Sequence, residues 1–426
     1  MANYGLHVAA DGTILLNDKP FYGYGLNIYH SFQWTVDGYY EGEEREFYKE
    51  DIRLCKAYHM PVARMPFSSW GDRCYRLFDE EPEVFFSILD KVVEEAERQQ
   101  LGLIASLLWN QDTLPYYVGE KRSAIGDINS RTMAFAKRYI GAIVRRYKNS
   151  PAVWGWEIGN EYNLTADLYK KDFSAYLPND CFKIGKWSMA DYYTSADLRL
   201  FYTELAGVIR AEDPYRMITN GNAIMRAHSK YLRQMAAVEM CRAAEVADVP
   251  KEAEYDTFEE FCEMNAWMCP DPMDTVSYHF QHATWRGNPP AYTMEHIMGG
   301  KKVDTRGYID GYVEMGQRLK KATYFGEFGD FCDMETDERR QSEWSNLDKN
   351  WKILLQAMVE GGVQLATAWV PFAPGENGRF NHTLDGIQPG YFNEVRMPDI
   401  RDTNDEFAAK GLQCTEEYWA TACATV

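Results

Sequence analysis

The sequence lacks the features that mark secreted and membrane proteins. Its 9 cysteines include no CxxC pair, and an odd number does not complete a disulfide framework, so we expect reduced thiols and a cytoplasmic location. No uninterrupted apolar run is long enough to cross a bilayer, and the N-terminus lacks a basic start followed by an apolar core. The sequence therefore predicts neither a membrane span nor a signal peptide.

Positive charge is also scarce. Lys and Arg total 45 against 64 Asp and Glu, which gives a net charge of -19. Such a field repels nucleic acids and anionic membranes, so we expect neither as a partner, and a neutral or cationic small molecule fits better. Aromatic residues are abundant, at 15%. They indicate either a large core or a groove lined with flat rings, and composition does not separate the two.

Eight short apolar runs lie along the chain. They lack the polar/apolar alternation of a half-exposed strand, which is typical of strands buried on both faces of a parallel sheet. We predict strands at residues 21–28, 61–67, 101–109, 152–160, 216–221, 274–281, 322–328 and 363–370. Helical stripes lie between them, formed by Phe85, Ile88, Leu89, Val92, Val93 and Ala96 and by Met133, Ala136, Ile140, Ile143, Val144 and Tyr147.

Strand and helix alternating eight times predict an α/β protein, a single catalytic (β/α)8 TIM barrel over residues 1–426. The main rival is a doubly wound open sheet, which usually has a Gly-rich phosphate turn after its first strand; GYGLNIYHSF has none. Insertions at about 161–200 and 222–273 exceed a helix and a turn. Because loops after barrel strands rim the active-site face, we expect these C-terminal-face insertions to narrow its mouth; a small helical subdomain with an interface role is the alternative.

Polar residues stand where several predicted strands reach the mouth. Arg64 lies on the second strand, Asn160 and Glu161 end the fourth, His279 and Gln281 end the sixth, Glu327 ends the seventh, and Trp369 closes the eighth. Two carboxylates across one mouth can cleave a glycosidic bond, because one protonates the leaving oxygen while the other attacks the anomeric carbon or activates water. This convergence predicts a glycosidase.

The two glutamates of VWGWEIGNE differ in depth. Glu157 lies four residues inside the strand, where we expect a hydrogen-bonded structural acid, whereas Glu161 reaches the rim. Aromatic neighbours are expected to raise the pKa of Glu161, as a proton donor requires. A nucleophile instead needs a pKa low enough for it to stay ionised, and we expect the cation of Arg64 to keep Glu327 in its carboxylate form.

Two segments resemble a known family. WGWEIGNEYN and YFGEFGDF are similar to the acid/base and nucleophile segments of clan A glycoside hydrolases, with family 5, the cellulase and mannanase family, as the nearest match. The opening DGTILLNDKPFYGYGLNIY also resembles that family's short hairpin before the first strand. The resemblance implies that Glu161 is the acid/base, Glu327 the nucleophile, Asn160 the donor to the sugar 2-hydroxyl and Trp369 the floor of the cleaved-sugar subsite. It implies no cofactor.

The chain departs from the family at two places. His279-Phe280-Gln281 stands where the family often has His-x-Tyr, and the third-strand segment LLWNQDT looks more like the mannanase branch. Further substrate-binding candidates are Trp109, Asn110, Trp285, His279, Gln281 and His30. His279 and His282 suggest a metal, but no third ligand is evident, so we expect none.

The combined prediction is a retaining β-glycosidase, leaning to an exo-acting β-mannosidase that takes small imported oligosaccharides. The alternatives are a β-glucosidase or endo-β-1,4-glucanase on the same barrel, or a barrel that binds carbohydrate without cleaving it. The sequence does not decide the sugar identity, the linkage or the oligomeric state, and a homo-oligomer is one of the open alternatives.

Overall fold

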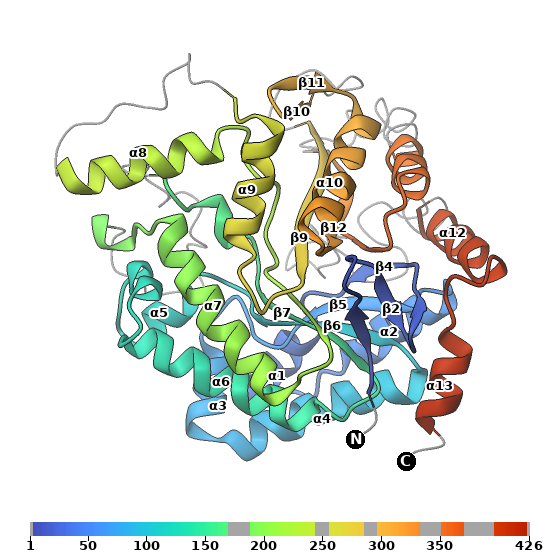
Figure 1. Ribbon diagram of the computed structural model, residues 1–426. Helices are drawn as coiled ribbons and strands as arrows, with labels where there is room; N and C mark the ends of the chain where they lie inside the picture. Colours follow the sequence, from blue (N-terminus) through green and yellow to red (C-terminus); the bar gives the residue numbers. More distant parts are fainter. Residues whose placement is uncertain are drawn as a thin grey trace, which may run out of the picture.

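The computed structural model describes residues 3–168, 188–242, 255–284, 296–332, 351–369 and 396–423 (Figure 1). For residues 237–242, 281–284, 296, 330–332 and 423 it describes the backbone alone.

Eight parallel strands close into a barrel, as predicted. They are β4 (Gly23–Asn27), β5 (Val62–Pro66), β6 (Gly102–Leu108), β7 (Val153–Gly159), β8 (Met217–Thr219), β9 (Thr275–Thr284), β12 (Ala322–Cys332) and β13 (Leu365–Ala368). Six of the predicted runs contain their strand, and the runs at 274–281 and 322–328 hold the first parts of β9 and β12. Each strand from β4 to β8 and β13 is buried along its whole length, which is why these runs read as continuously apolar.

Two strands continue past the barrel. β9 and β12 remain paired out to Thr284 and Cys332, so the prediction that Gln281 and Glu327 end their strands is wrong. The register also shifts between Phe325 and Glu327. A bulge of this kind bends a strand and re-aims the side chain beside it, which turns Glu327 toward the mouth.

Helices surround the barrel (Figure 1). They are α1 (Ser31–Glu41), α2 (Phe47–Ala57), α3 (Arg73–Glu80), α4 (Pro82–Gln99), α5 (Thr113–Tyr117), α6 (Arg131–Tyr147), α7 (Ser195–Glu212), α8 (Ser229–Arg242), α9 (Phe258–Met268), α10 (Thr305–Leu319), α12 (Met397–Ala409), α13 (Thr415–Cys423) and a helix over 351–360. All members of the two predicted stripes are buried on α4 and α6. The stripes therefore face the barrel, as their period predicted.

The N- and C-terminal segments meet at the base of the barrel. The predicted hairpin is a small antiparallel sheet of β1 (Leu6–Val8), β2 (Ile14–Leu16) and β3 (Lys19–Pro20). The hydroxyl of Tyr418 on α13 accepts a hydrogen bond from the Gly5 amide and donates one to the carbonyl of Pro151 before β7. The C-terminal segment forms two helices, α12 and α13, with Gly411 at φ 71° between them.

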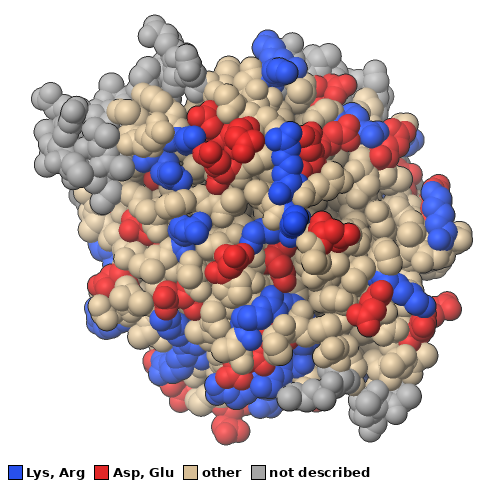
Figure 2. All heavy atoms as spheres, in the orientation of Figure 1, with Lys and Arg blue, Asp and Glu red and all other residues tan. Residues whose placement is uncertain are grey.

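The described helices of the second insertion, α8 and α9, lie at one end of the molecule. Figure 1 shows them at the top of the view, together with the hairpin of β10 (His296–Met298) and β11 (Lys301–Val303). Figure 2 shows acidic and basic side chains interspersed over the visible face, so the negative charge forms no single patch there. Among the described residues, no helix has the length and apolar character needed to span a membrane.

Candidate active site

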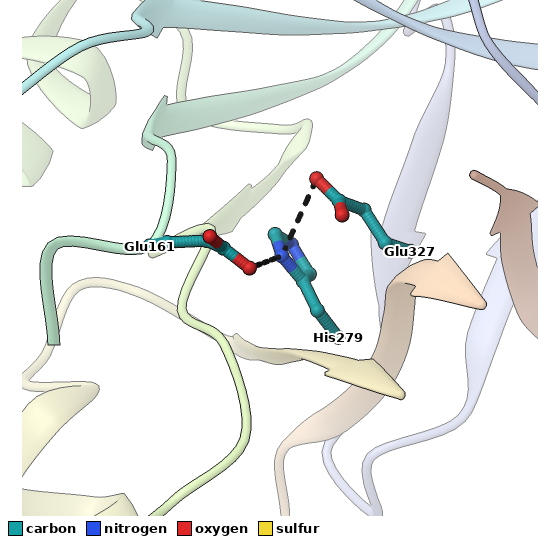
Figure 3. Close-up of side chains that lie close together, drawn as sticks. All are labelled: Glu161, His279 and Glu327. Atoms are coloured by element: carbon teal, nitrogen blue, oxygen red, sulfur yellow. Dashed lines mark hydrogen bonds and ion pairs between the residues drawn. The ribbon is translucent and has the colours of Figure 1, made fainter. Parts of the chain in front are cut away.

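Glu161 and Glu327 face each other across the barrel mouth, with His279 between them (Figure 3). Glu161 follows β7, and Glu327 pairs in register with His279 across β12 and β9. One carboxylate oxygen of each glutamate and a ring nitrogen of His279 all lie within 4.8 Å of one another. His279 Nδ1 lies 2.8 Å from Glu161 Oε1 and 3.4 Å from Glu327 Oε1. The two acids singled out in the sequence are thus brought together.

A tight turn places Glu161 at the rim. Its backbone has φ 56°, a left-handed conformation that is uncommon for a residue with a side chain, and its amide donates to the Gly221 carbonyl at 2.8 Å. Gly221 itself has φ 73°, and a Cβ there would come within 1.7 Å of the Gly159 carbonyl oxygen. The turn thus depends on glycine at 221, and it leaves the Glu161 side chain 31% exposed.

Arg64 connects the site below the glutamates. Its guanidinium is fully buried and donates to Glu327 Oε1 at 2.9 Å and to Asn160 Oδ1 at 2.7 Å. Glu157 accepts from the same guanidinium, which confirms the expectation that it is a hydrogen-bonded acid inside the barrel. Arg64 lies on the second barrel strand, as predicted, and it contacts both Glu327 and Asn160, the residue before Glu161.

Asn27 on β4 was missed by the sequence reasoning. Its Oδ1 accepts from Arg64 Nη1 at 2.9 Å, and its Nδ2 donates to the Gly326 carbonyl at 2.9 Å. The Thr367 hydroxyl donates to the same carbonyl at 2.6 Å. Together they hold the bulge that aims Glu327. The one amide in the apolar run FYGYGLNI was a signal that could have found it, because a buried amide needs hydrogen-bond partners.

Burial dominates the electrostatics of Glu327. The side chain is 4% exposed, and desolvation raises its pKa to about 7, against the lowering effects of His279 and Arg64. The negative charge of Glu161 raises it further. We expected Arg64 to keep this carboxylate ionised; the ion pair is present, but the cost of burial exceeds it.

Three aromatic rings form one wall. Trp369 is half-buried and stacks on Tyr29 at 5.0 Å between ring centroids, with 26° between the planes. Trp109 lies 6.5 Å from Trp369, nearly parallel to it, and the Arg64 guanidinium lies 4.6 Å from the Trp109 ring. Since Trp109 is 1% exposed, it supports the wall from behind, while Trp369 offers open ring surface. Tyr29 was also missed by the sequence reasoning.

Two other predicted binding residues are buried in the fold. Asn110 Oδ1 accepts from the Asp112 amide at 2.7 Å, as in a turn. His30 is 2% exposed, with Nε2 3.2 Å from Asp51 and its ring against Trp34. Both side chains are engaged in contacts within the protein. Trp285 lies outside the described residues, as do the side chains of Gln281 and His282.

Glu161, His279 and Glu327 are close enough to renew the metal hypothesis. However, the Arg64 guanidinium already lies 2.9 Å from the Glu327 carboxylate and would repel a metal cation held there. The carboxylates and the imidazole are also side chains of the types that acid–base and nucleophilic chemistry uses.

Comparison with known proteins finds similarity to glycoside hydrolases. No family model matches the sequence. The mannan endo-1,4-beta-mannosidase 4 of Solanum lycopersicum is 29% identical over 195 residues, 40% of this chain and 47% of that protein. This chain spans about half the length of the curated relatives it matches.

Solved structures extend the similarity to the whole barrel. An endo-1,4-beta-mannanase from Rhizomucor miehei covers 94% of this chain and 99% of its own, with a TM-score of 0.58 and 16% identity. A glycoside hydrolase family 5 mannosidase from Rhizomucor miehei covers 97% and 99%, with a TM-score of 0.57 and 14% identity. The chain therefore shares the closed (β/α)8 barrel of these structures, and its curated relatives support the resemblance of the segments on β7 and β12 to clan A glycoside hydrolases of family 5.

Proposed function

We propose that this protein is a retaining β-mannosidase that releases single sugars from the ends of small β-linked mannosides. The observation that carries the proposal is the 4.8 Å limit on the separation of the Glu161 and Glu327 oxygens. Retaining glycosidases have carboxyl groups about 5–5.5 Å apart, whereas inverting ones need about 6.5–9.5 Å to admit a water. The close spacing therefore favours double displacement.

In the first step, a Glu327 oxygen attacks the anomeric carbon while Glu161 gives its proton to the departing glycosidic oxygen. This forms a glycosyl ester on Glu327 and releases the rest of the substrate as an alcohol. In the second step, Glu161 takes a proton from water, the water oxygen attacks the anomeric carbon, and Glu327 leaves as a carboxylate. Two inversions restore the β configuration. Asn160, next to Glu161, is suited to hydrogen-bond the sugar, and Trp369 to stack beneath it.

The raised pKa of Glu327 invites the opposite assignment, since a proton donor is often the acid with the raised pKa. We keep Glu327 as the nucleophile because a guanidinium only donates hydrogen bonds and so stabilises the carboxylate form that it contacts. Glu161 lies at the open rim, where a departing group has room. In this assignment, activity rises with pH as Glu327 loses its proton.

The mannoside part of the proposal draws on the named relatives. The tomato relative and one Rhizomucor miehei structure are endo-acting by name, whereas the other structure is named a mannosidase. The two structures match this barrel equally well, so the fold does not rank exo over endo action. We favour exo action because the insertions add α8 and α9 to one end of the molecule. An endo-mannanase is the second candidate, favoured by the names of the curated relatives.

We also propose a cytoplasmic location, for an enzyme that takes imported oligosaccharides. The support is that the 9 cysteines are odd in number and that the five described, Cys55, Cys74, Cys262, Cys269 and Cys414, are free thiols. Cell fractionation tests it, and recovery of the protein outside the cytoplasm would contradict it.

The substrate test compares hydrolysis of nitrophenyl β-mannoside with that of nitrophenyl β-glucoside. We expect a clear preference for the mannoside, and a glucoside preference would overturn the sugar assignment. Digestion of mannohexaose then separates exo from endo action, because exo action releases mannose from the first minutes, whereas endo action gives internal fragments first.

The roles of the two glutamates are tested with alanine variants and azide. Azide should rescue Glu327→Ala by giving a glycosyl azide of inverted configuration, and it should rescue Glu161→Ala with retained configuration. The reverse pattern would exchange the roles, and full activity of both variants would remove them.

A further inference from the structure

The guanidinium of Arg64 has an acceptor for each of its five N–H groups. Nη1 donates to Asn27 and to Glu327, both at 2.9 Å. Nη2 donates to Asn160 at 2.7 Å and lies 2.8 Å from Glu157 Oε1, while Nε lies 2.9 and 3.1 Å from the two Glu157 oxygens. Glu157 therefore takes the forked edge of the guanidinium, and Glu327 receives one N–H.

Glu157 is held in this position from all sides. It is fully buried, and among the described residues Arg64 is its only hydrogen-bond partner. Its register neighbours Ser106 and Thr219 carry buried hydroxyls that have no partner in the described part of the chain. Gly221 packs so closely that a Cβ there would lie 2.9 Å from Glu157 Cγ and Cδ. This packing keeps the Glu157 carboxylate oriented toward Arg64.

We propose that Glu157 is a positioning residue: it fixes the guanidinium of Arg64 in the plane that reaches Glu327 and Asn160, and it limits how much positive charge reaches Glu327. A forked carboxylate contact fixes both the plane and the rotation of a guanidinium, which one hydrogen bond does not. The proposal rests on the proposed function, in which Glu327 is the nucleophile.

The second part of the proposal follows from the charges around Glu327. Its titratable neighbours come from four strands: Arg64 on β5, Glu157 on β7, Glu161 after β7, His279 on β9 and Tyr324 on β12. One guanidinium thus serves two buried carboxylates. Because Glu157 has the stronger contact, Glu327 is left only partly compensated and takes up a proton more readily. With a neutral residue at 157, Glu327 would be the one carboxylate in contact with Arg64, and the guanidinium would stabilise its charged form more strongly.

The test uses Glu157→Gln, Glu157→Asp and a matched control at the base. Asp213→Asn removes the carboxylate from another buried pair, Asp213 with Arg216 at 2.7 Å. The pH dependence of kcat/KM is measured on nitrophenyl β-mannoside for all three. We expect the acid limb of Glu157→Gln to move about one pH unit lower, because the pKa of Glu327 falls when an opposite charge is freed beside it. Glu157→Asp and Asp213→Asn should keep the acid limb in place.

Glu157→Asp tests the positioning part and covers the case in which Glu157→Gln does not fold. Its shorter side chain keeps the charge but retreats from the guanidinium, so we expect kcat to fall about tenfold or more with little change in KM. An unchanged kcat would overturn the positioning part. An unmoved acid limb in Glu157→Gln, or an equal shift in Glu157→Asp, would overturn the charge part.

A second readout does not need a substrate. The side-chain carboxyl carbon of Glu327 is titrated by NMR in protein labelled with ¹³C-glutamate, with its signal assigned from its absence in Glu327→Gln. If no sugar is hydrolysed but this titration moves to lower pH in Glu157→Gln, the proposed function fails and the role of Glu157 stands. If mannosides are hydrolysed and the titration does not move, the role of Glu157 fails alone.

Discussion

Two buried arginines at opposite ends of the barrel show how one residue type serves structure or chemistry. Arg216, at the base, donates to the carbonyls of Val153, Lys148 and Ser150 and to one carboxylate, Asp213. Its charge is matched one to one, and most of its partners are backbone. Arg64, at the mouth, donates only to side chains, namely two carboxylates and two amides on β4, β12 and β7 or directly after β7.

The difference lies in the unmatched charge. At the base, one cation meets one anion, and backbone oxygens fill the other positions, an arrangement that stabilises a fixed structure. At the mouth, one cation meets two anions, so one of them is left poised between charged and neutral forms. The raised pKa of Glu327 is the result. A strongly shifted pKa of this kind is typical of functional sites, and it distinguishes the Arg64 cluster from the Arg216–Asp213 ion pair.

The largest expected effect comes from a substitution of Glu327, at the mouth of the barrel. Glu327→Gln removes the nucleophile while keeping the shape of the side chain, so we expect kcat to fall by about 10⁴-fold or more. The assay is hydrolysis of nitrophenyl β-mannoside, with folding checked by circular dichroism. A variant that keeps most of its activity would show that the reaction does not pass through this carboxylate.

The second prediction concerns the Asp213–Arg216 ion pair at the base of the barrel. Asp213→Asn leaves Arg216 buried without a counter-charge, so we expect a loss of about 3 kcal/mol in the free energy of unfolding. Denaturant titration measures it. The kcat of the folded variant should equal that of the parent; a large loss of kcat would mean that the two ends of the barrel are not independent.

The third prediction compares a glycine at each end. A Cβ on Gly221 would meet the Gly159 carbonyl at 1.7 Å and shift the turn that holds Glu161, so Gly221→Ala should lower kcat about 100-fold. Gly5 at the base also has a positive φ, 84°, and its Cβ would lie 2.8 Å from the Trp154 carbonyl. Gly5→Ala should therefore reduce the melting temperature without reducing kcat. Equal kcat in the two variants would contradict the comparison.

The smallest expected effect is on stability against pH. Because the pKa of Glu327 is raised in the folded protein, this group favours folding below its unfolded pKa of about 4.5, and the contribution is lost as pH rises through about 7. Glu327→Gln should thus be more stable than the parent by on the order of 2 kcal/mol at pH 8, with a smaller gain at pH 5. Thermal unfolding at the two pH values measures the difference, and an equal gain at both would contradict the assignment.

The sequence was sufficient for the barrel and for the two glutamates. Strands buried on both faces must be apolar, and a polar residue such as Glu161 at the end of such a run has few structural reasons to be there. Both signals are local in the chain.

The remaining features depend on contacts between distant segments. The bulge beside Glu327 is set by pairing with β9 and by the amide of Asn27, and neither leaves a mark on YFGEFGDF itself. The extensions of β9 and β12 beyond the barrel stabilise each other as a pair. The pKa of Glu327 is the balance of burial against Arg64 and His279, which only the folded geometry sets.

The most direct test of the account traps the glycosyl ester on the protein. A 2-deoxy-2-fluoro-mannosyl fluoride slows both steps by destabilising the positive charge that develops at the anomeric carbon, but its good leaving group lets the first step proceed, so the covalent intermediate accumulates. Mass spectrometry of the digested protein should find the sugar on Glu327, in the peptide that contains YFGEFGDF. A label on Glu161, or inactivation without a covalent label, would contradict it.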